Sequence, residues 1–466
     1  MAWLFDPTRN WCIYLFLLMG AVFTRLDSPF EPTVWRHATD LPPLEGTLAR
    51  NDRLTPAEHL SEDVLIGPET FAIGNDGYVY TGLWDGTVVR LDKNGENPKG
   101  VFFTGGFVSP VGRAVASTNG LDYETALLRE CQAKARERKL SVKDERQCGR
   151  PLGLKFRSPK KLYVLDAYHG LFEIDLAAGG KAKQLINALT DKPLPFEKDN
   201  EGPRKHMRAG VVAEEVEKPL LFLNDILFTK GGFVFLTDSS WKHPRAYNRR
   251  EIIDGAPRGR LLRYDLASGE LRTMMCGLHF PNGLELDRSG TKLLVVESMR
   301  FRILEVDLEG LLARDPRSRK APPSASALAD ALCYCGEQDT LPEGVDVFAE
   351  SLPGFVDGMV YDEEHGGYIC AAGTKVAHPF SALHLALKHA GWIRTLIGKL
   401  IPIGLLDKLV PHYGMLVILR EDGSVKESMQ DPTGRTAFVS AAHRHPESGF
   451  TFLGSSQNPY LGRVRL

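Results

Sequence analysis

The chain lacks the charge excess expected of a nucleic-acid-binding protein. Its 57 Lys and Arg residues and 59 Asp and Glu residues leave a formal net charge of −2 at pH 7. Neither the basic nor the aromatic residues are concentrated in one stripe along the sequence. Because a nucleic-acid surface depends on concentrated positive charge, we expect no nucleic-acid partner.

Cysteine is scarce, and glycosylation sequons are absent. The seven cysteines follow no zinc-ligand spacing, which argues against a zinc module. No Asn-x-Ser/Thr triplet occurs anywhere in the chain. Glycosylation therefore offers no support for a lumenal location.

Long apolar runs are also scarce, and the main one lies near the N-terminus. Residues 11–23 are apolar and are flanked by Arg9 and Arg25. This run is shorter than the usual ~20-residue membrane span, but its apolar flanks extend it far enough for a thin membrane. We expect residues 1–27 to form a cytosolic tip and an uncleaved signal-anchor helix. A cleavable signal peptide is the alternative, although Gly20-Ala21-Val22 is a mediocre cleavage site.

This anchor predicts a single-pass type II membrane protein with its body in the endoplasmic reticulum lumen or outside the cell. Residues 28–60 are Pro-rich and irregular, so we expect a stalk there. The remaining residues, 61–466, then form the body of the protein.

The body contains a repeated unit of β-hairpins. In residues 280–298, a polar side chain opens one strand, a short turn follows, and a buried strand rich in β-branched residues comes next. The same pattern recurs near residues 67–82, 151–166, 222–238 and 355–371, and residues 449–454 supply the final strand of a sixth copy. Recurrence at roughly 60–85 residues predicts an all-β fold, a six-bladed β-propeller with insertions.

Four copies of the unit carry an oxygen ligand at the same point: Glu69, Asn224, Asn282 and Asp357. Radial repetition of the blades would bring these side chains together at one end of the central channel. Two carboxylates and two amides form a hard-oxygen site, which suits calcium or another hard divalent cation. The alternative is that each residue serves local turn chemistry at a strand start.

Three insertions interrupt the repeats, at residues 111–150, 242–257 and 314–343. Cys131 and Cys148 both lie in the first, and a disulfide between them fits a lumenal domain and would stabilise it by roughly 3 kcal/mol. Two free thiols are the alternative. The second insertion is polar and basic, and we expect it to be solvated. The third carries no chemical signal, and no pairing is assigned to Cys333 and Cys335.

Residues 380–411 alternate apolar positions with lysine and arginine. This pattern predicts one or two amphipathic basic helices in an otherwise all-β protein. Such helices would cap the channel mouth, lie on a membrane surface, or do both. Plain packing against the propeller face is an equal alternative.

Several long strings resemble the strictosidine synthase-like family, above all its animal-type members. They are residues 148–153 (Cys-Gly-Arg-Pro-Leu-Gly), 166–171, 279–283 and 352–355. The resemblance runs from about Leu65 to the C-terminus. It implies a six-bladed β-propeller, a single-pass type II membrane protein and arylesterase-like hydrolase activity. A cysteine pair just before the Arg-Pro-Leu-Gly motif is also typical of the family.

The wider superfamily includes paraoxonases and gluconolactonase-like proteins, which hold a divalent ion in the channel. Their Glu/Asn/Asn/Asp ligand set resembles the four residues named above, in the same order. In these enzymes the metal polarises an ester or lactone carbonyl. Strictosidine synthase instead uses a glutamate in its last blade for a condensation, and the corresponding position here, within residues 438–445, holds alanine. The resemblance therefore does not imply alkaloid condensation.

Two histidines are candidate catalytic bases, His169 and His279. His169 resembles one member of the paraoxonase histidine pair, while the other member aligns near Leu152. An imidazole beside a metal can titrate near neutral pH. A hydrogen-bonded structural role is the alternative for each histidine. Asp225 and Glu297 border the expected site as outer partners or extra ligands.

Two functional classes follow from these residues. The first is a metal-dependent hydrolase of a small apolar ester or lactone, with the membrane contacted through the N-terminal anchor and the basic helices. The second is a non-catalytic lumenal propeller in which a structural calcium ion joins the blades and one face binds a ligand or a protein.

Overall fold

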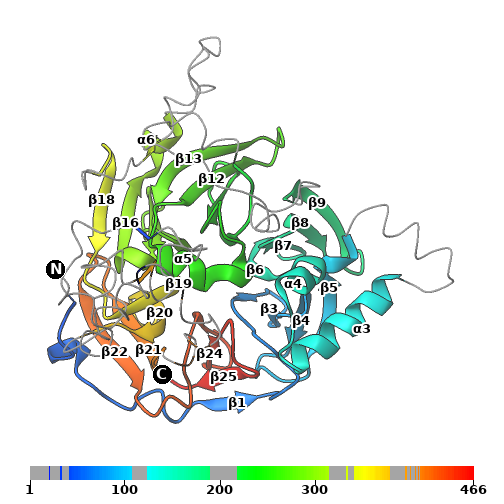
Figure 1. The fold of residues 1–466 in the computed structure, drawn as a ribbon, viewed down its shortest axis with the longest axis horizontal. Helices are drawn as coiled ribbons and strands as arrows, with labels where there is room; N and C mark the ends of the chain where they lie inside the picture. The colour runs from blue at the N-terminus through cyan, green and yellow to red at the C-terminus, as the bar shows by residue number, and fades with distance from the viewer. Residues whose placement is uncertain are drawn as a thin grey trace, which may run out of the picture.

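The structure is a computed structural model of the chain. It describes residues 41–107, 123–188, 218–313, 341–377 and 410–466, together with the isolated positions 20, 32–33, 332–333, 394–395, 399, 405 and 408. These residues form six β-sheets arranged in a ring (Figure 1). The predicted all-β, six-bladed propeller is confirmed.

Each blade is built from consecutive antiparallel strands, and the first three blades contain the following strands. Blade one has β2 (Phe71–Ile73), β3 (Val79–Gly82), β4 (Thr87–Leu91) and β5 (Lys99–Phe103). Blade two has β6 (Pro151–Ser158), β7 (Lys161–Asp166), β8 (Gly170–Asp175) and β9 (Lys181–Asn187). Blade three has β10 (Leu223–Phe228), β11 (Phe233–Asp238), β12 (Gly259–Asp265) and β13 (Leu271–Leu278), and the short β17 (Leu332–Cys333) adds a parallel fifth strand.

The last three blades complete the ring. Blade four has β14 (Pro281–Leu286), β15 (Lys292–Glu297), β16 (Arg302–Asp307) and β18 (Val345–Ala349). Blade five has β19 (Gly354–Asp362), β20 (Gly367–Lys375), β21 (Gly414–Leu419) and β22 (Val425–Asp431). Blade six has β23 (Ala441–Arg444), β24 (Thr451–Gly454) and β25 (Leu461–Val464).

An N-terminal strand closes the ring. β1 (Glu58–Leu60) pairs antiparallel with β25 as the outer strand of blade six. The segment 449–454 contains β24, the second strand of that blade, and therefore completes the sixth strand–turn–strand unit as expected. Residues 58–60, assigned to the stalk from sequence, belong to the sheet, and Leu54 and Ala57 before them are buried. A three-residue strand is too short to show an alternating pattern, so the sequence did not reveal it.

The first strands of the blades surround the channel. β2, β6, β10, β14, β19 and β23 contact one another in this cyclic order. Glycines make the close approach possible, because a Cβ on Gly283 would lie 2.8 Å from the carbonyl oxygen of Asp357 in the next blade. A Cβ on Gly153 would likewise lie 3.0 Å from the carbonyl oxygen of Asn224. Because glycine has no side chain, the first strands can approach closely at these two positions, and this close approach sets the radius of the ring.

The apolar core fills the space between neighbouring blades. Leu227 and Phe235 of blade three pack with Leu284 and Val295 of blade four, for example, and all four are buried. A blade packs one face against the preceding blade and the other face against the following blade. Its second strand is therefore buried on both faces, which explains the continuous apolar runs there.

The first insertion is helical and is closed by a disulfide. It contains α3 (Tyr123–Arg136) and α4 (Val142–Cys148), and the 3-10 turn η3 (Thr104–Phe107) precedes it. Cys131 and Cys148 form a disulfide with a Cα–Cα distance of 5.8 Å, so this pairing is confirmed. Ser141 and Asp144 form a capping box at the start of α4. Cys276 is also disulfide-bonded, which the sequence did not indicate.

The second insertion is folded and largely buried, so the expectation of a solvated segment is wrong. It contains η5 (Arg245–Tyr247) and α5 (Asn248–Asp254), and α5 lies near the middle of the ring in Figure 1. Its charged groups pair with one another: Asp254 accepts a hydrogen bond from Arg258 at 2.5 Å and is 3.0 Å from His243 Nε2. Each of these pairs neutralises a buried charge, which would otherwise be unpaired in a medium of low dielectric constant.

Three distant parts of the chain meet at the end of α5. Arg394, from the expected basic helices, donates hydrogen bonds to the carbonyl oxygens of Ile253 and Asp254 at 2.8 and 2.9 Å. It also donates to the carbonyl oxygen of Thr33, whose own amide donates to Asp254. A guanidinium at the last carbonyls of a helix is a favourable cap. Arg394 therefore packs on the propeller face, while most of residues 380–411 lie outside the described residues.

The remaining elements are short. They are η2 (Gly46–Leu48), η6 (Ser298–Arg300) and α6 (Leu308–Ala313). Among the described residues, no helix has both the length and the apolar character needed to cross a bilayer. The expected anchor in residues 1–27 lies outside them except for position 20, and so does most of the third insertion.

We predict that Gly283→Ala destabilises the propeller by about 1–3 kcal/mol, the usual cost of overpacking. The added Cβ would press on the backbone of Asp357, Gly358 and Met359 in blade five. A thermal or denaturant melt measures the effect. Gly373→Ala is the control, because its Cβ would meet nothing closer than 3.7 Å. Equal midpoints for the two variants would contradict the close approach of the blades.

Candidate metal centre

The four predicted ligands lie where the first strands enter the channel. Asn224, Asn282 and Asp357 sit inside β10, β14 and β19, each between two pairing partners where the register shifts. Glu69 lies two residues before β2. Such bulges bend a strand and re-aim a side chain. The repeated bulge explains why residues in phase along the sequence share one end of the channel.

Glu69, Asn282 and Asp357 interact directly. Asp357 is hydrogen-bonded to the Asn282 side chain and lies within electrostatic range of Glu69. Burial, followed by the negative charge of Glu69, raises the pKa of Asp357 well above its usual value. Asp357 therefore lies in a place where a carboxylate needs either a proton or a nearby cation.

Asn224 is linked to the same group through a serine. Its Nδ2 donates a hydrogen bond to Ser239 Oγ at 2.9 Å, and Ser239 Oγ donates to the carbonyl oxygen of Pro281 at 2.7 Å. With Nδ2 fixed in this way, the amide presents its Oδ1 as the remaining acceptor. Pro281 directly precedes Asn282, so Asn224 and Asn282 are neighbours across the blade boundary.

Hydroxyl groups also hold the backbone of the ligand residues. Thr237 Oγ1 donates to the carbonyl oxygen of Asn282 at 2.8 Å. Ser440 Oγ donates to the carbonyl oxygen of Glu69 at 2.6 Å. Because each bond joins adjacent blades, the ligand positions are fixed by the ring as a whole.

Glu69 is also bound by an arginine. Arg150 is fully buried, and its guanidinium donates to Glu69 Oε2 at 2.7 Å and to the carbonyl oxygen of Gly67 at 2.8 Å. Arg245 lies 3.9 Å from the same carboxylate oxygen. Arg245 is itself paired with Glu145 of α4 at 3.2 Å. One oxygen of Glu69 is thus engaged, and Oε1 has no such bond to an arginine.

These four residues fit a hard divalent cation by their chemistry. One oxygen from each of Glu69, Asn224, Asn282 and Asp357 gives four hard donors, a set that calcium accepts with water completing its shell. Among the described residues, no group of three or more His, Cys, Asp or Glu side chains is placed to hold a metal. The centre would therefore depend on its two amides.

An aromatic collar borders the centre. Phe222, Phe280 and Phe355 each lie two residues before a ligand residue. Their rings meet edge to face, with centroids 5.4 Å apart between Phe222 and Phe280 and 5.6 Å apart between Phe280 and Phe355. Phe280 has a φ of 58°, an uncommon value for a bulky residue that marks local strain. We call these three residues the aromatic collar.

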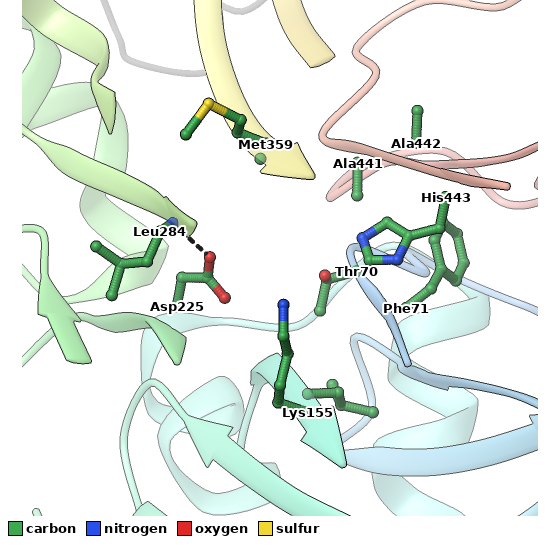
Figure 2. A pocket seen from close by; sticks show the side chains of 11 residues that line it. Thr70, Phe71, Lys155, Asp225, Leu284, Met359, Ala441, Ala442 and His443 are labelled. Atoms are coloured by element: carbon green, nitrogen blue, oxygen red, sulfur yellow. Dashed lines mark hydrogen bonds between the residues drawn. The ribbon is translucent and has the colours of Figure 1, made fainter. Parts of the chain in front are cut away.

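A small cavity lies in the channel, where the first strands of the six blades meet (Figure 2). All six blades contribute to its lining, which includes Thr70, Asp225 and Gly358, each directly following a ligand residue. Its volume is about 20 Å³, enough for one or two water molecules. The cavity is too small for an organic substrate.

Lys155 and Asp225 dominate the charge of this cavity. Figure 2 shows Lys155 pointing into it, with Asp225 to one side. Lys155 Nζ lies 3.6 Å from a carboxylate oxygen of Glu285. The negative charge of Glu285 raises the pKa of Lys155, while burial raises that of Asp225 to about 6. Burial and the Lys155 charge lower the pKa of His443, which also lines the cavity, to about 3.

His169 has a structural environment. Its side chain is fully buried, and its ring nitrogens lie 3.1 Å from the carbonyl oxygen of Thr104 and 2.9 Å from that of Arg146. Both nitrogens are thus engaged by backbone, which ties the end of α4 to blade two. The ring offers no free nitrogen to a substrate.

His279 is likewise committed to a partner. Its Nδ1 lies 3.2 Å from Glu297 Oε1, and its backbone amide donates to the same oxygen at 2.8 Å. Burial lowers the pKa of His279. Glu297 also accepts a hydrogen bond from Arg302 at 2.7 Å. Burial would raise the pKa of Glu297, but Arg302, His279 and Arg300 together lower it. Glu297 is therefore a partner of His279 and Arg302.

Sequence reasoning gave no role to three features of this region. Arg150 lies within the Cys-Gly-Arg-Pro-Leu-Gly string, but nothing in that string names its partner 81 positions earlier. The aromatic collar was visible as a phenylalanine two residues before three of the ligands. Lys155 carries no distinguishing signal in the sequence, and only the structure shows that it lies beside Asp225 in the channel.

Comparisons with known proteins agree with this architecture. Residues 46–91 match the family model for "strictosidine synthase-like, N-terminal", and residues 225–307 match that for "strictosidine synthase". The chain is 31% identical to adipocyte plasma membrane-associated protein from Bos taurus over 452 residues, which cover 96% of this chain and 87% of that protein. The Homo sapiens relative of the same name is 30% identical, covering 96% and 86%.

Solved structures resemble the chain more distantly. A gluconolactonase from Xanthomonas campestris has 13% identity and a TM-score of 0.46, covering 94% of this chain and 98% of that one. A likeness at this level carries no argument about the chemistry of the present chain.

We predict that Asp225 makes a contribution to the stability of the metal-free protein that becomes less favourable as the pH rises from about 4 to about 6. In this range the unfolded chain has released the proton of Asp225, while the folded state, with its pKa of about 6, still holds it. The folded state then binds more protons, so its stability falls with increasing pH. Asp357 acts in the same direction and extends the loss to higher pH.

Melting temperatures in chelator across this range measure the effect. Asp225→Asn removes this contribution, so its stability relative to the wild type should rise between pH 4 and pH 6, whereas Asp346→Asn, at an exposed position, should follow the wild type. A stability difference between Asp225→Asn and the wild type that does not change with pH would show that Asp225 is not desolvated.

Proposed function

The chain belongs to the strictosidine synthase-like family, and from this premise we propose that it is a metal-dependent hydrolase of esters or lactones. The observation that carries the proposal is the partly buried Asp357 carboxyl beside Glu69 and Asn282, whose pKa is raised well above its usual value by desolvation and by the charge of Glu69. A carboxyl placed there at an energetic cost fits a functional site better than a packing role.

The proposed cation is calcium or another hard divalent ion, held by Glu69, Asn224, Asn282 and Asp357. When bound, it would supply a Lewis acid that polarises the substrate carbonyl. The chain's own contribution is to fix the donors. The Asn224 amide is oriented by Ser239, and the Glu69 carboxylate is oriented by Arg150.

Asp357 is our candidate for the group that accepts a proton from the attacking water. Glu69 is bonded to Arg150, whereas the side-chain partner of Asp357 is the neutral amide of Asn282. A carboxylate without an arginine partner is the better base. This assignment replaces His169, both of whose ring nitrogens face backbone carbonyls, and His279, whose Nδ1 faces Glu297.

The surroundings favour a small apolar substrate. Within the aromatic collar, Phe222 and Phe280 are buried, and Phe355 is partly exposed and offers apolar contact surface. The cavity lined by Thr70, Asp225 and Gly358 holds water-sized molecules alone, so the substrate would bind beside Phe355. Blade six lines that cavity with Ala441, Ala442 and His443 and supplies no carboxylate there, which supports hydrolysis over condensation.

Turnover of phenyl acetate and of simple lactones by the purified full-length chain tests the proposal. We expect activity that a chelator abolishes and calcium restores. Asp357→Asn keeps an oxygen donor but loses the base, so it should still bind the ion while activity falls by about 10²-fold or more. Asp346→Asn is the control, because it makes the same chemical change at an exposed position.

An ion that binds without any turnover would favour the alternative, a non-catalytic propeller with a structural cation. One observation supports that alternative: the four donors come from blades one, three, four and five, so a shared ion would join four blades. Full activity in Asp357→Asn would remove Asp357 from the mechanism.

We further propose that the protein is membrane-associated, as the names of its relatives suggest. The Cys131–Cys148 disulfide fits an oxidising compartment. In this proposal residues 1–27 anchor a single-pass type II protein whose propeller is lumenal or extracellular. Protease protection of tags at the two ends tests this. A C-terminal tag that is protected in sealed microsomes supports it, and one that is digested contradicts it.

A further inference from the structure

Arg150 binds both the backbone and the side chain of the segment that carries Glu69. One guanidinium nitrogen donates to the Gly67 carbonyl oxygen at 2.8 Å and the other to Glu69 Oε2 at 2.7 Å. The side chain of Arg150 is fully buried. Gly67 has a φ of 63°, and a Cβ there would lie 3.2 Å from the guanidinium, so glycine leaves room for the contact.

The disulfide-closed insertion fixes the position of Arg150. Cys148, the last residue of α4, is bonded to Cys131 and lies two positions before Arg150. The carbonyl oxygen of Arg150 accepts a hydrogen bond from the Ala167 amide at 2.9 Å in blade two. The guanidinium therefore reaches Glu69 in blade one from a rigid support, and its place does not depend on an ion.

A cation at the ring would compete with this guanidinium. Both are positive, and both are attracted to the carboxylate of Glu69. Without an ion, Arg150 neutralises Glu69, whose charge would otherwise be buried and uncompensated. With an ion, the two positive groups share one carboxylate at close range and repel each other.

We propose that Arg150 is an internal counter-ion of the metal centre, which keeps the propeller folded without an ion and lowers the affinity for the ion. The proposal rests on the proposed metal site. Arg245, at 3.9 Å from Glu69 and paired with Glu145, has a smaller part. Arg150 acts through Glu69 and is a positioning residue, without contact to the substrate.

Two effects of Arg150 oppose each other, and their sizes decide the direction. Holding Glu69 in one rotamer favours ion binding by about tenfold at most. Repulsion between a guanidinium and a divalent ion roughly 6 Å apart, at an effective dielectric constant of about 20, opposes binding by about 10⁴-fold. The repulsion is larger, so we expect Arg150→Met to bind calcium at least tenfold more tightly than the wild type.

The test compares full-length wild type, Arg150→Met, Arg150→Lys and the control Arg288→Gln, which removes one positive charge at an exposed pair with Glu421. Calcium titration calorimetry gives the dissociation constants, and melting curves in chelator and in excess calcium give the stabilities. We expect Arg150→Met to melt far below wild type in chelator and to recover most of the loss in calcium. Arg150→Lys keeps the charge and should stay near the wild type, as should Arg288→Gln.

Equal or weaker calcium binding by Arg150→Met would overturn the proposal, and so would a stability loss that is the same with and without calcium. An Arg150→Met protein that fails to fold even in excess calcium would overturn it too, because the ion should replace the missing charge. These outcomes leave the metal centre intact if the wild type binds calcium. If neither protein binds calcium, the proposed function itself fails.

Discussion

Two carboxylates, Glu69 and Asp357, come close together at one end of a narrow channel, and the surrounding structure answers the resulting need for positive charge. Arg150 satisfies Glu69 with a direct hydrogen bond. Asp357 has an amide partner, and burial with the charge of Glu69 raises its pKa. The pair is therefore only half compensated by the chain itself, which is the physical reason for expecting a cation there.

The propeller places these groups through a few repeated local devices. A register shift near the start of β10, β14 and β19 surrounds one candidate ligand in each strand, and glycines such as Gly283 let the next blade approach. Hydroxyl groups from the preceding blade, such as that of Thr237, hold the backbone of the ligand residues. No single blade makes a site; the arrangement exists because the ring closes through β1 and β25.

The fold, and the equivalent places of the four candidate ligands in their blades, could be predicted from the sequence because both depend on repetition. A unit that recurs in phase places equivalent residues at equivalent points. The repeat alone therefore identifies Asn224 and Asn282 as equivalent positions. A contact between residues at non-equivalent positions leaves no repeated pattern in the sequence. The bond between Arg150 and Glu69 and the burial of the 242–257 insertion depend on which loops meet above the ring, and the pattern of one segment does not contain that. For His169 the residue type suggested catalysis, whereas its contacts with two backbone carbonyls give it a structural task.

A crystal structure of the full-length protein grown with calcium, with a manganese soak to locate the ion by anomalous scattering, tests the central claim most directly. We predict one ion in the channel, with oxygens of Glu69, Asn224, Asn282 and Asp357 within about 2.3–2.6 Å and Arg150 still bonded to Glu69. A channel without an ion at saturating calcium, or an ion bound elsewhere while these four side chains point apart, would contradict the account.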